Sequence, residues 1–292
     1  MRLAPAIGPY LRLTRAPAVF TAISNILAAH LIATGGAIDW PVLGLLAAAS
    51  ACLYSAGMVL NDCFDLAEDR RERPSRPLPS GAVPLAAAWA LGWGLLAAGV
   101  ALAGVVSARA LALASAIALL VFLYDAGLKH TLAGPIAMGG CRYLNWVLGL
   151  SVAGLGAGAW LIAMPAFLYT VSISVLSREE TRAERHRAVL AAGAGVVLTA
   201  VWIAALVPLG LLAHAWALVL VALALAVVLH RLRGTYRDFT PERVQDTLRF
   251  LILGIVALDA LLALAGGPWW GALAVLALLL PARWLARVTD VT

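Results

Sequence analysis

The amino-acid sequence predicts an all-α protein, a polytopic transmembrane helical bundle of nine to ten spans around a central cavity that opens at the cytoplasmic face. Hydrophobic residues make up 63% of the 292 residues and charged residues only 12%, which is too apolar for a soluble domain of this length. Apolar stretches of about 20 residues, long enough to cross a bilayer as helices, recur along the whole chain. The distribution of charge then indicates where the cavity opens.

The expected spans follow one another with short connections, several of which contain Gly or Pro, such as Gly35-Gly36 and Gly266-Gly267-Pro268. Residues 1–14 are expected to form a short interfacial helix, and residues 269–286 form either a tenth span or a helix at the interface. No soluble insert separates the spans, so residues 1–292 are interpreted as a single domain. Hydrophobic periodicity and length place the spans at about 15–34, 42–61, 83–106, 108–125, 134–152, 157–177, 188–208, 211–230, 246–266 and 269–286.

Basic residues fall almost entirely on one side of this arrangement. With a cytoplasmic N-terminus and ten spans, all of the 21 Lys and Arg residues except Arg109 lie on the cytoplasmic side, as the positive-inside rule requires. Among the acidic residues, only Asp39 lies on the far side and Asp259 lies within a span. The net charge of +6 is therefore explained by membrane topology rather than by nucleic-acid binding. The expected location is the cytoplasmic membrane of a bacterium, with the site facing the cytosol.

An acidic and then basic stretch joins the second and third expected spans. It reads Asn61-Asp62-Cys63-Phe64-Asp65-Leu66-Ala67-Glu68-Asp69 and continues to Arg76-Pro77-Leu78-Pro79-Ser80-Gly81. On a helix, Asp62, Asp65 and Asp69 share one face, where three like charges repel one another. Mg²⁺ removes that repulsion, since it prefers oxygen ligands and is held by one or two carboxylates plus substrate phosphates. Arg73 and Arg76 suit a diphosphate. The alternative is an ordinary solvated loop between two helices.

This stretch resembles the first aspartate-rich motif of the UbiA superfamily of intramembrane prenyltransferases, NDxxDxxxD followed by a segment ending RPLPSG. The resemblance covers about residues 10–265. In that family the aspartates hold Mg²⁺ on the diphosphate of an isoprenoid donor, which implies that role for Asp62, Asp65 and Asp69, with Asn61 at the substrate. The resemblance makes Mg²⁺ the expected cofactor. The expected partners are a prenyl diphosphate donor, a small-molecule or lipid acceptor and the lipid bilayer, with no nucleic acid.

The loop after the fourth span contains a second basic candidate. The segment Tyr124-Asp125-Ala126-Gly127-Leu128-Lys129-His130 resembles the family's Tyr-x-x-x-x-Lys-Arg segment, with His130 in place of Arg. Lys129 is the only lysine in the protein, and a lysine point charge is a common phosphate partner. The alternative role for Lys129 is a positive-inside anchor. Asp125 is either a further ligand or the ion partner of Lys129.

Five polar residues in or beside otherwise apolar helices are further candidates for functional roles. Arg142 lies inside an expected span, where a charge is costly and usually faces a cavity or a partner. Arg142 is expected to bind diphosphate, and Asn145, one turn later, lies on the same face. Arg15 and Asn25 resemble the first-helix pattern of the family and are expected to bind substrate. Asp259 is a functional-site hypothesis because it is an ionisable residue within a span, and no family motif supports it.

The loop after the sixth span departs from the family pattern. The family carries a second aspartate motif here, usually DxxxD, whereas this sequence has Glu180-x-x-x-Glu184 with Glu179 adjacent. On a helix, Glu180 and Glu184 share a face and are expected to hold a second Mg²⁺. The longer glutamate marks a divergent member of the family with another acceptor. The alternative is a loop of salt bridges between residues four apart.

The resemblance implies Mg²⁺-dependent transfer of a prenyl group from an isoprenoid diphosphate to an unidentified acceptor within the membrane, with Asp62, Asp65 and Lys129 as catalytic residues. Cations stabilise the charge that develops on the leaving diphosphate, and apolar helix walls keep water from the allylic cation. Two alternatives stay open. One is a UbiA-type terpene cyclase that acts on one prenyl diphosphate. The other is a non-catalytic lipid-binding or transport protein, which the Glu-containing second motif, Arg142 and Asp259 would suit.

Overall fold

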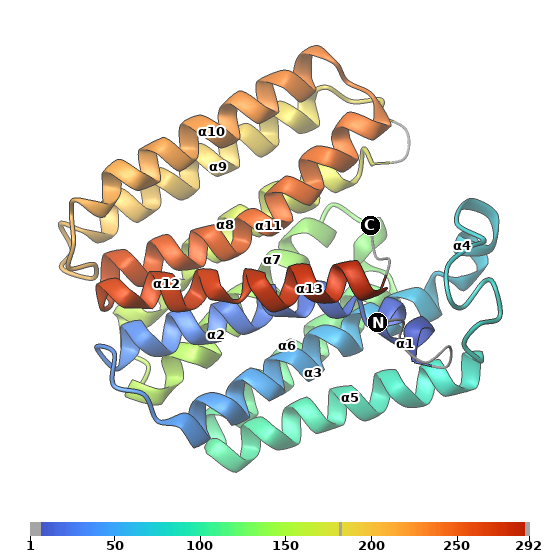
Figure 1. Ribbon diagram of the computed structural model, residues 1–292, viewed down its shortest axis with the longest axis horizontal. Helices are drawn as coiled ribbons and strands as arrows, with labels where there is room; N and C mark the ends of the chain where they lie inside the picture. The colour runs from blue at the N-terminus through green and yellow to red at the C-terminus, as the bar shows by residue number, and fades with distance from the viewer. Residues whose placement is uncertain (1–6, 181–182, 290–292) are drawn as a thin grey trace.

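The computed structural model describes residues 7–180 and 183–289, and its regular elements there are all helical, as predicted. Its longer helices are α2 (Phe20–Ala33), α3 (Trp40–Phe64), α5 (Leu85–Val106), α6 (Ala108–Ala126), α7 (Gly134–Leu150), α8 (Ala157–Ser177), α9 (Arg187–Leu206), α10 (Ala217–Arg237), α11 (Pro241–Gly266), α12 (Trp269–Ala277) and α13 (Leu279–Thr289). The shorter elements are α1 (Gly8–Leu13), η1 (Ala16–Val19), α4 (Leu66–Glu72), η2 (Leu128–His130) and η3 (Ser151–Ala153). Figure 1 shows the long helices running alongside one another, with α12 and α13 end to end.

The chain is an integral, multi-pass membrane protein. Among the described residues, nine segments are long and apolar enough to cross a membrane; η1 joins α2 in one of them, and α12 joins α13 in another. The predicted span that is not among these nine is the fifth, at 134–152, which corresponds to α7; this helix has 17 residues and packs against α2, α6 and α8. The predicted boundaries agree best with the observed ones for spans that are apolar over their whole length, such as α6 and α8.

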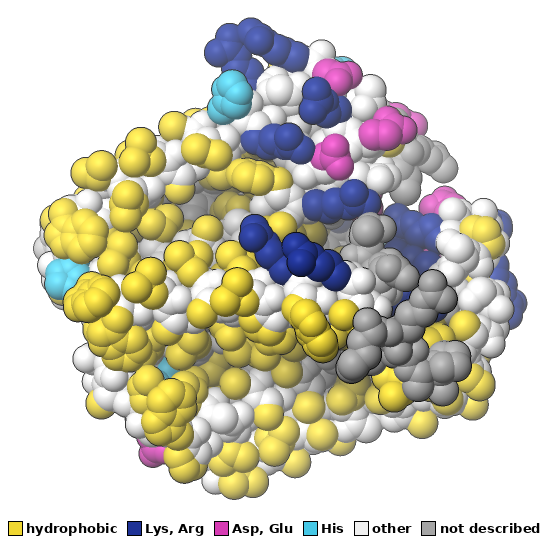
Figure 2. Space-filling view, viewed as in Figure 1, with side chains coloured by type: hydrophobic (Ala, Val, Ile, Leu, Met, Phe, Trp, Pro, Cys, Tyr) yellow, Lys and Arg dark blue, Asp and Glu magenta, His cyan; other side chains and the backbone are white. Residues whose placement is uncertain are grey.

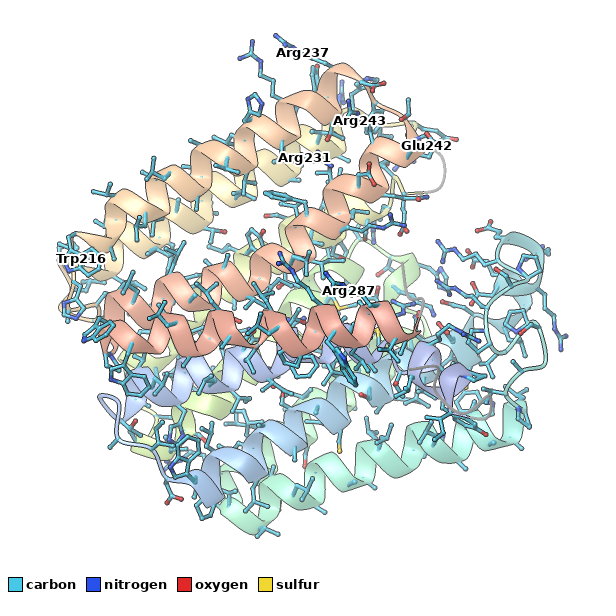
Figure 3. The ribbon with its side chains drawn as sticks, viewed as in Figure 1. Trp216, Arg231, Arg237, Glu242, Arg243 and Arg287 are labelled. Atoms are coloured by element: carbon cyan, nitrogen blue, oxygen red, sulfur yellow. The ribbon has the colours of Figure 1, made fainter. Side chains whose placement is uncertain are left out.

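The largest boundary error is at α10, which we predicted at 211–230 and which runs from Ala217 to Arg237. Arginines continue this helix beyond its apolar part, because their long side chains keep the charge at the membrane surface while the backbone stays helical. Figure 3 shows Arg237 and Arg243 at one end of the molecule and Trp216 at the opposite end. The helix α11 likewise begins before its apolar part, at Pro241, where the Thr240 hydroxyl accepts a hydrogen bond from the Arg243 amide.

Charged groups gather at one end of the bundle, which we call the α4 end. Figure 1 shows α1, α4 and the end of α13 at this end, and the α2–α3 and α9–α10 connections at the opposite end. On the visible face in Figure 2, hydrophobic side chains cover the opposite end, and most of the Lys and Arg side chains lie toward the α4 end. This separation suits a bundle whose apolar surface meets lipid and whose polar chemistry is concentrated at one membrane face.

The helix α7 packs unusually close to its neighbours because glycines face them. A Cβ atom added at Gly139 would lie 2.6 Å from the side chain of Val171 on α8. One added at Gly149 would lie 2.6 Å from Ala29 Cβ on α2. Small residues let membrane helices approach in this way. The tight fit carries Arg142 of α7 into the interior of the bundle rather than toward lipid.

Candidate active site

A cavity of about 610 Å³ lies between α2, α3, α6, α7, α8 and α11. Charged side chains line it toward the α4 end, and they include Arg15, Arg73, Arg76, Asp125 and Glu180. Its deeper wall is largely apolar and includes Leu53, Ile117, Val121, Ile173 and Ile255. The cavity therefore joins a charged entrance to an apolar interior.

Two of the predicted aspartates share one arginine. Asp62, in the last turn of α3, and Asp69, in α4, are 4% and 3% exposed. Arg76 Nη1 donates to Asp69 Oδ2 at 2.7 Å and to Asp62 Oδ1 at 3.3 Å. Arg15 Nη2 adds a longer contact of 3.5 Å to Asp62 Oδ1, and Arg73 Nη1 lies 4.0 Å from Asp69 Oδ1. Each buried carboxylate is thus neutralised by side chains that also line the cavity.

The third aspartate contacts the only lysine. Lys129 Nζ lies 2.5 Å from Asp65 Oδ1 and 4.0 Å from Asp125 Oδ1. Asn61 Nδ2 donates to Asp125 Oδ1 at 2.9 Å, so α3 and α6 are joined beside this pair. The prediction of one continuous helical face for the aspartates was wrong, because α3 ends at Phe64 and α4 begins at Leu66. The break at Asp65 lets its carboxylate reach a different cation from the one that Asp62 and Asp69 share.

Local structure holds Arg76 in place. The segment after it turns back at Gly81, which has a φ of +75° that favours glycine. Leu78 and Val83 on either side of this turn are buried in a small apolar cluster with Leu13 of α1. The proline-rich tail that follows Arg76 is therefore anchored in the protein, and that anchoring limits where the guanidinium can go.

Arg15 is held in an uncommon backbone conformation. Its φ is +48° and its ψ is 47°, the left-handed region, immediately before η1. A residue with a Cβ in this region carries a small steric cost that surrounding structure must offset. Here η1 packs against α3 and α13, so the helices on both sides fix the turn that carries Arg15 to Asp62.

Three of the candidate residues deeper in the protein lie together. Arg142 Nη1 donates to Asn25 Oδ1 at 3.2 Å and to the Thr21 carbonyl at 2.9 Å, and Nη2 donates to Thr21 Oγ1 at 3.2 Å. Asn145 Nδ2 also donates to Asn25 Oδ1, at 3.2 Å. Arg142 and Asn145 line the cavity, whereas Asn25 is fully buried behind them.

The predicted second acidic motif is arranged differently from the prediction. The helix α8 ends at Ser177 and α9 begins at Arg187, so Glu180 and Glu184 do not share a helix face. Glu180 lines the cavity, whereas Glu184 is exposed. Glu179 is buried, and its Oε2 accepts hydrogen bonds of 2.9 Å from the backbone N–H groups of Glu184 and Arg185. The prediction that Glu180 and Glu184 bind metal stays a prediction, and the shared helix face on which it was based is wrong.

The acidic groups do not form a closed metal site by themselves. Within residues 7–180 and 183–289, no three Asp, Glu, His or Cys side chains come close enough together to hold a metal ion. Basic side chains lie between the carboxylates instead, with Arg76 between Asp62 and Asp69. The available ligands at this site are carboxylate and amide oxygens, which suit Mg²⁺ rather than a soft metal.

Two cavity residues on α11 were not predicted from the sequence. Gln245 and Arg249 both line the cavity, and Gln245 Nε2 donates to the Glu180 carbonyl at 3.3 Å. Their spacing of four residues was available as a signal, since it puts two polar side chains on one face of a helix. Tyr54 of α3 was also missed; its ring lies 5.8 Å below the Arg142 guanidinium.

Comparisons with known proteins agree with this architecture. The family model described as the UbiA prenyltransferase family matches residues 22–252. Digeranylgeranylglyceryl phosphate synthase of Methanoculleus marisnigri is 31% identical over 178 residues, which span 60% of this chain and 63% of that protein. The matched region thus covers less than two thirds of this relative's length.

Solved structures show the same fold. A structure of digeranylgeranylglyceryl phosphate synthase superposes with a TM-score of 0.69 at 23% identity, over 90% of this chain and 99% of that one. A UbiA homologue from Archaeoglobus fulgidus bound to DMAPP and Mg²⁺ gives a TM-score of 0.64 at 16% identity, over 86% of this chain and 99% of that one. Because the family model covers most of the chain, this protein belongs to the UbiA prenyltransferase family.

Proposed function

We propose that this chain is a Mg²⁺-dependent intramembrane prenyltransferase that transfers a prenyl group from an isoprenoid diphosphate to a lipid acceptor carrying glyceryl phosphate. One observation carries the proposal. Three carboxylates beside the charged end of an apolar cavity are each neutralised by a basic side chain: Asp62 and Asp69 by Arg76, and Asp65 by Lys129. Such pairs can exchange, with the basic side chains moving to a phosphate and the carboxylates to a metal ion.

The residues at the entrance fit Mg²⁺ and a diphosphate together. Asp62, Asp65 and Asp69 would hold the ion jointly with diphosphate oxygens, since Mg²⁺ in proteins is usually held by few carboxylates plus phosphate. When bound, Mg²⁺ supplies positive charge that stabilises the leaving diphosphate. The A. fulgidus homologue bound to DMAPP and Mg²⁺ supports this proposal. Whether Glu180 takes part in metal binding stays a prediction.

The chain's own cations would bind the donor's diphosphate. Arg15, Arg73 and Arg76 line the entrance, and Lys129 lies beside it against Asp65 and Asp125, so together they would provide charge and N–H groups for its oxygens. Their attraction grows as the allylic C–O bond breaks and negative charge builds on the diphosphate, so they favour the transition state over the ground state.

The apolar wall would hold the prenyl chain and exclude water. Leu53 of α3, Val121 of α6 and Ile173 of α8 belong to this wall. Water that reached the allylic cation would convert the donor to a prenyl alcohol, so a dry cavity protects the transfer reaction. In the transfer, the carbon–oxygen bond to diphosphate breaks, a carbon–oxygen bond to the acceptor hydroxyl forms, and the hydroxyl proton leaves with the released diphosphate.

The relatives suggest the acceptor class. Their named product, digeranylgeranylglyceryl phosphate, carries two geranylgeranyl groups on glyceryl phosphate. A single transfer that completes it needs an acceptor that already has one such group, a free hydroxyl and a phosphate. We propose an acceptor of this lipid class here, with the α4 end facing the cytosol of a cytoplasmic membrane, because basic side chains gather at that end.

The test is transfer by the purified protein in lipid nanodiscs. Labelled prenyl diphosphates of different chain length are incubated with geranylgeranylglyceryl phosphate, with Mg²⁺ or with EDTA. We expect a prenylated lipid only with Mg²⁺, and a loss of about 10³-fold in kcat/KM for Asp62→Asn and Asp65→Asn. Asp238→Asn is the matched control, because Asp238 is an exposed carboxylate paired with Arg243 outside the cavity.

The outcomes separate the alternatives. Formation of a cyclic or eliminated hydrocarbon from the donor alone would indicate a terpene cyclase instead of a prenyltransferase. Equal diphosphate release by the wild type, Asp62→Asn and Asp65→Asn would show that these aspartates do not take part in the reaction. Absence of Mg²⁺-dependent diphosphate release with every donor would favour the non-catalytic alternative.

A further inference from the structure

An ionisable residue outside the entrance is buried at the centre of the bundle. Asp259 of α11 is fully buried and accepts three hydrogen bonds from two other helices. Its Oδ2 accepts from Ser24 Oγ at 2.5 Å and from Asn25 Nδ2 at 2.7 Å, both on α2. Its Oδ1 accepts from Trp146 Nε1 of α7 at 3.0 Å. Asp259 thus ties together the three helices that form one side of the cavity.

The surroundings of Asp259 suit an ionised carboxylate. Two of its partners, the Asn25 amide NH₂ and the Trp146 indole N–H, can only donate, and an ionised carboxylate only accepts. In the part of the chain that the structure describes, no Lys, Arg or His nitrogen lies within 4.0 Å of it. A buried carboxylate without a direct cation is expensive in a membrane and is usually tied to function.

Asn25 links Asp259 to the cavity. Because its Nδ2 group donates to Asp259, its Oδ1 atom must face the other way, where it accepts from Arg142 Nη1 and Asn145 Nδ2. The amide therefore lies between an anion and a cation, with its orientation set by the carboxylate. This is the shorter of two routes in the described residues from Asp259 to Arg142, which lines the cavity. The other runs through Ser24, whose Oγ contacts both Asp259 Oδ2 and the Thr21 carbonyl, to which Arg142 Nη1 also donates.

Arg142 retains donors for a ligand. A guanidinium has five N–H groups, and hydrogen bonds within the described residues use three of them. The group lies over the Tyr54 ring, and Tyr54 precedes Asp62 by two helical turns, or about 12 Å along α3. Arg142 is thus a second cationic site, deeper in the cavity than the cations around Asp62.

We propose that Asp259 is a positioning residue that, through Asn25, holds Arg142 in the cavity to bind the phosphate of the acceptor, while the entrance cations bind the donor's diphosphate. The proposal rests on the proposed function for the identity of the acceptor. A planar guanidinium with two free N–H groups suits the paired oxygens of a phosphate. Two separate cationic sites would let donor and acceptor phosphates occupy the same cavity without competing for the same side chains.

Replacement of the carboxylate by an amide should act at a distance. In Asp259→Asn, the new NH₂ group faces the donors of Ser24, Asn25 or Trp146, which favours rotation of the Asn25 amide. Asn25 would then turn its own NH₂ group toward Arg142, which would lose an acceptor and move. The donor's diphosphate contacts at Arg76 and Lys129 lie in other segments and should be unaffected.

The experiment is a double-mutant cycle in nanodiscs with two acceptors, geranylgeranylglyceryl phosphate and uncharged geranylgeranylglycerol. Asp259→Asn and Arg142→Met should each raise KM for the phosphorylated acceptor about tenfold. The double variant should stay within about twofold of Arg142→Met, since Asp259 acts through Arg142. KM for the donor and KM for the uncharged acceptor should change less than about twofold in all three variants.

Controls separate positioning from general destabilisation. Thr247 lies on α11, as Asp259 does, and Thr247→Val removes its buried hydrogen bond to Thr235 of α10. This variant should lower Tm without changing the acceptor KM. If Asp259→Asn does not fold, Asn25→Ala breaks the same link and should give the same selective rise in KM.

Two results would overturn the proposal. In the first, Asp259→Asn raises the acceptor KM by a further factor when it is added to Arg142→Met. In the second, KM rises equally for both acceptors. Equilibrium binding of labelled geranylgeranylglyceryl phosphate to the same variants needs no turnover. A wild type that makes no product would therefore refute the proposed function, while the binding arm would still decide the role of Asp259. Equal binding by the wild type, Asp259→Asn and Arg142→Met would refute that role.

Discussion

The two acidic segments at the α4 end differ in what their carboxylates contact. In the α3–α4 segment, Asp62 and Asp69 contact Arg76, and Asp65 contacts Lys129. In the α8–α9 loop, the buried Glu179 contacts backbone N–H groups of its own loop. The first segment is therefore held by ion pairs between side chains, and the second by local hydrogen bonds to the main chain.

This difference indicates which segment can change partners. A side-chain ion pair can break when a phosphate offers the cation a better partner, and the backbone need not move. The backbone N–H groups that Glu179 satisfies would be left without partners if it turned away, at a cost typical of broken charge-assisted hydrogen bonds. The α3–α4 segment thus suits ligand exchange, whereas Glu179 suits a fixed loop that presents Glu180 to the cavity.

The largest effect should follow loss of the arginine shared by two carboxylates. In Arg76→Gln, Asp62 and Asp69 lose their short contact, and the donor's diphosphate loses a cation as its charge builds. We expect kcat/KM for the donor to fall about 10²- to 10³-fold in a transfer assay. Arg243→Gln is the matched control, because Arg243 pairs with Asp238 away from the cavity. A fall of less than about threefold in Arg76→Gln would assign Arg76 to the stability of the loop instead.

A second, smaller loss should follow neutralisation of Lys129. Its side chain is 8% exposed and faces both Asp65 and Asp125. Lys129→Met should lower kcat/KM about 10²-fold, and Lys129→Arg should restore part of it, since charge is kept while the geometry of a compact ammonium is lost. Steady-state kinetics with the donor varied would measure this. Equal activity of the wild type and Lys129→Met would support the alternative of a topological anchor.

The sequence predicted well the features that depend only on neighbouring residues, such as helix length and the spacing of the aspartates. Apolar length gave the helices, and the spacing of Asp62, Asp65 and Asp69 indicated an acidic cluster that the structure places at the α4 end. Sequence spacing could not show that Asp65 would break the helix, nor that Arg76 would contact two of the three carboxylates. These contacts depend on how a folded loop returns to the helix that precedes it.

The parts that were missed depend on packing or on backbone bonds. The link between Asp259 and Arg142 joins α11, α2 and α7, which lie far apart in the sequence, and Gly149 lets α7 pack close to α2. Glu179 was not predicted as a site residue, because the resemblance to the family motif points to Glu180 and Glu184. Its bonds to backbone N–H groups leave no residue pattern from which they could be inferred.

A comparison within the α8–α9 loop should give an intermediate effect. Glu180 lines the cavity and Glu184 is exposed, so the two predicted metal ligands should not be equivalent. We expect Glu180→Gln to raise the Mg²⁺ concentration needed for half-maximal activity about tenfold, and Glu184→Gln to change it less than twofold. Titration of activity with Mg²⁺ would measure both. Equal shifts in the two variants would support the prediction that both glutamates bind the same metal ion. No shift in either variant would contradict that prediction.

The smallest effect on catalysis, with a clear effect on stability, should come from Glu179. Its Oε2 accepts two backbone hydrogen bonds of 2.9 Å, and the side chain is 6% exposed. Glu179→Gln keeps a carbonyl acceptor but removes the charge, so we expect it to destabilise the folded protein by about 1–2 kcal/mol, which a thermal-unfolding assay in detergent would detect as a lower Tm. At a temperature where both proteins are folded, kcat should stay within about twofold of the wild type, because Glu179 contacts its own backbone rather than the cavity. A large loss of kcat at unchanged Tm would mean that Glu179, and not Glu180, is the acidic residue of this loop that meets the substrate.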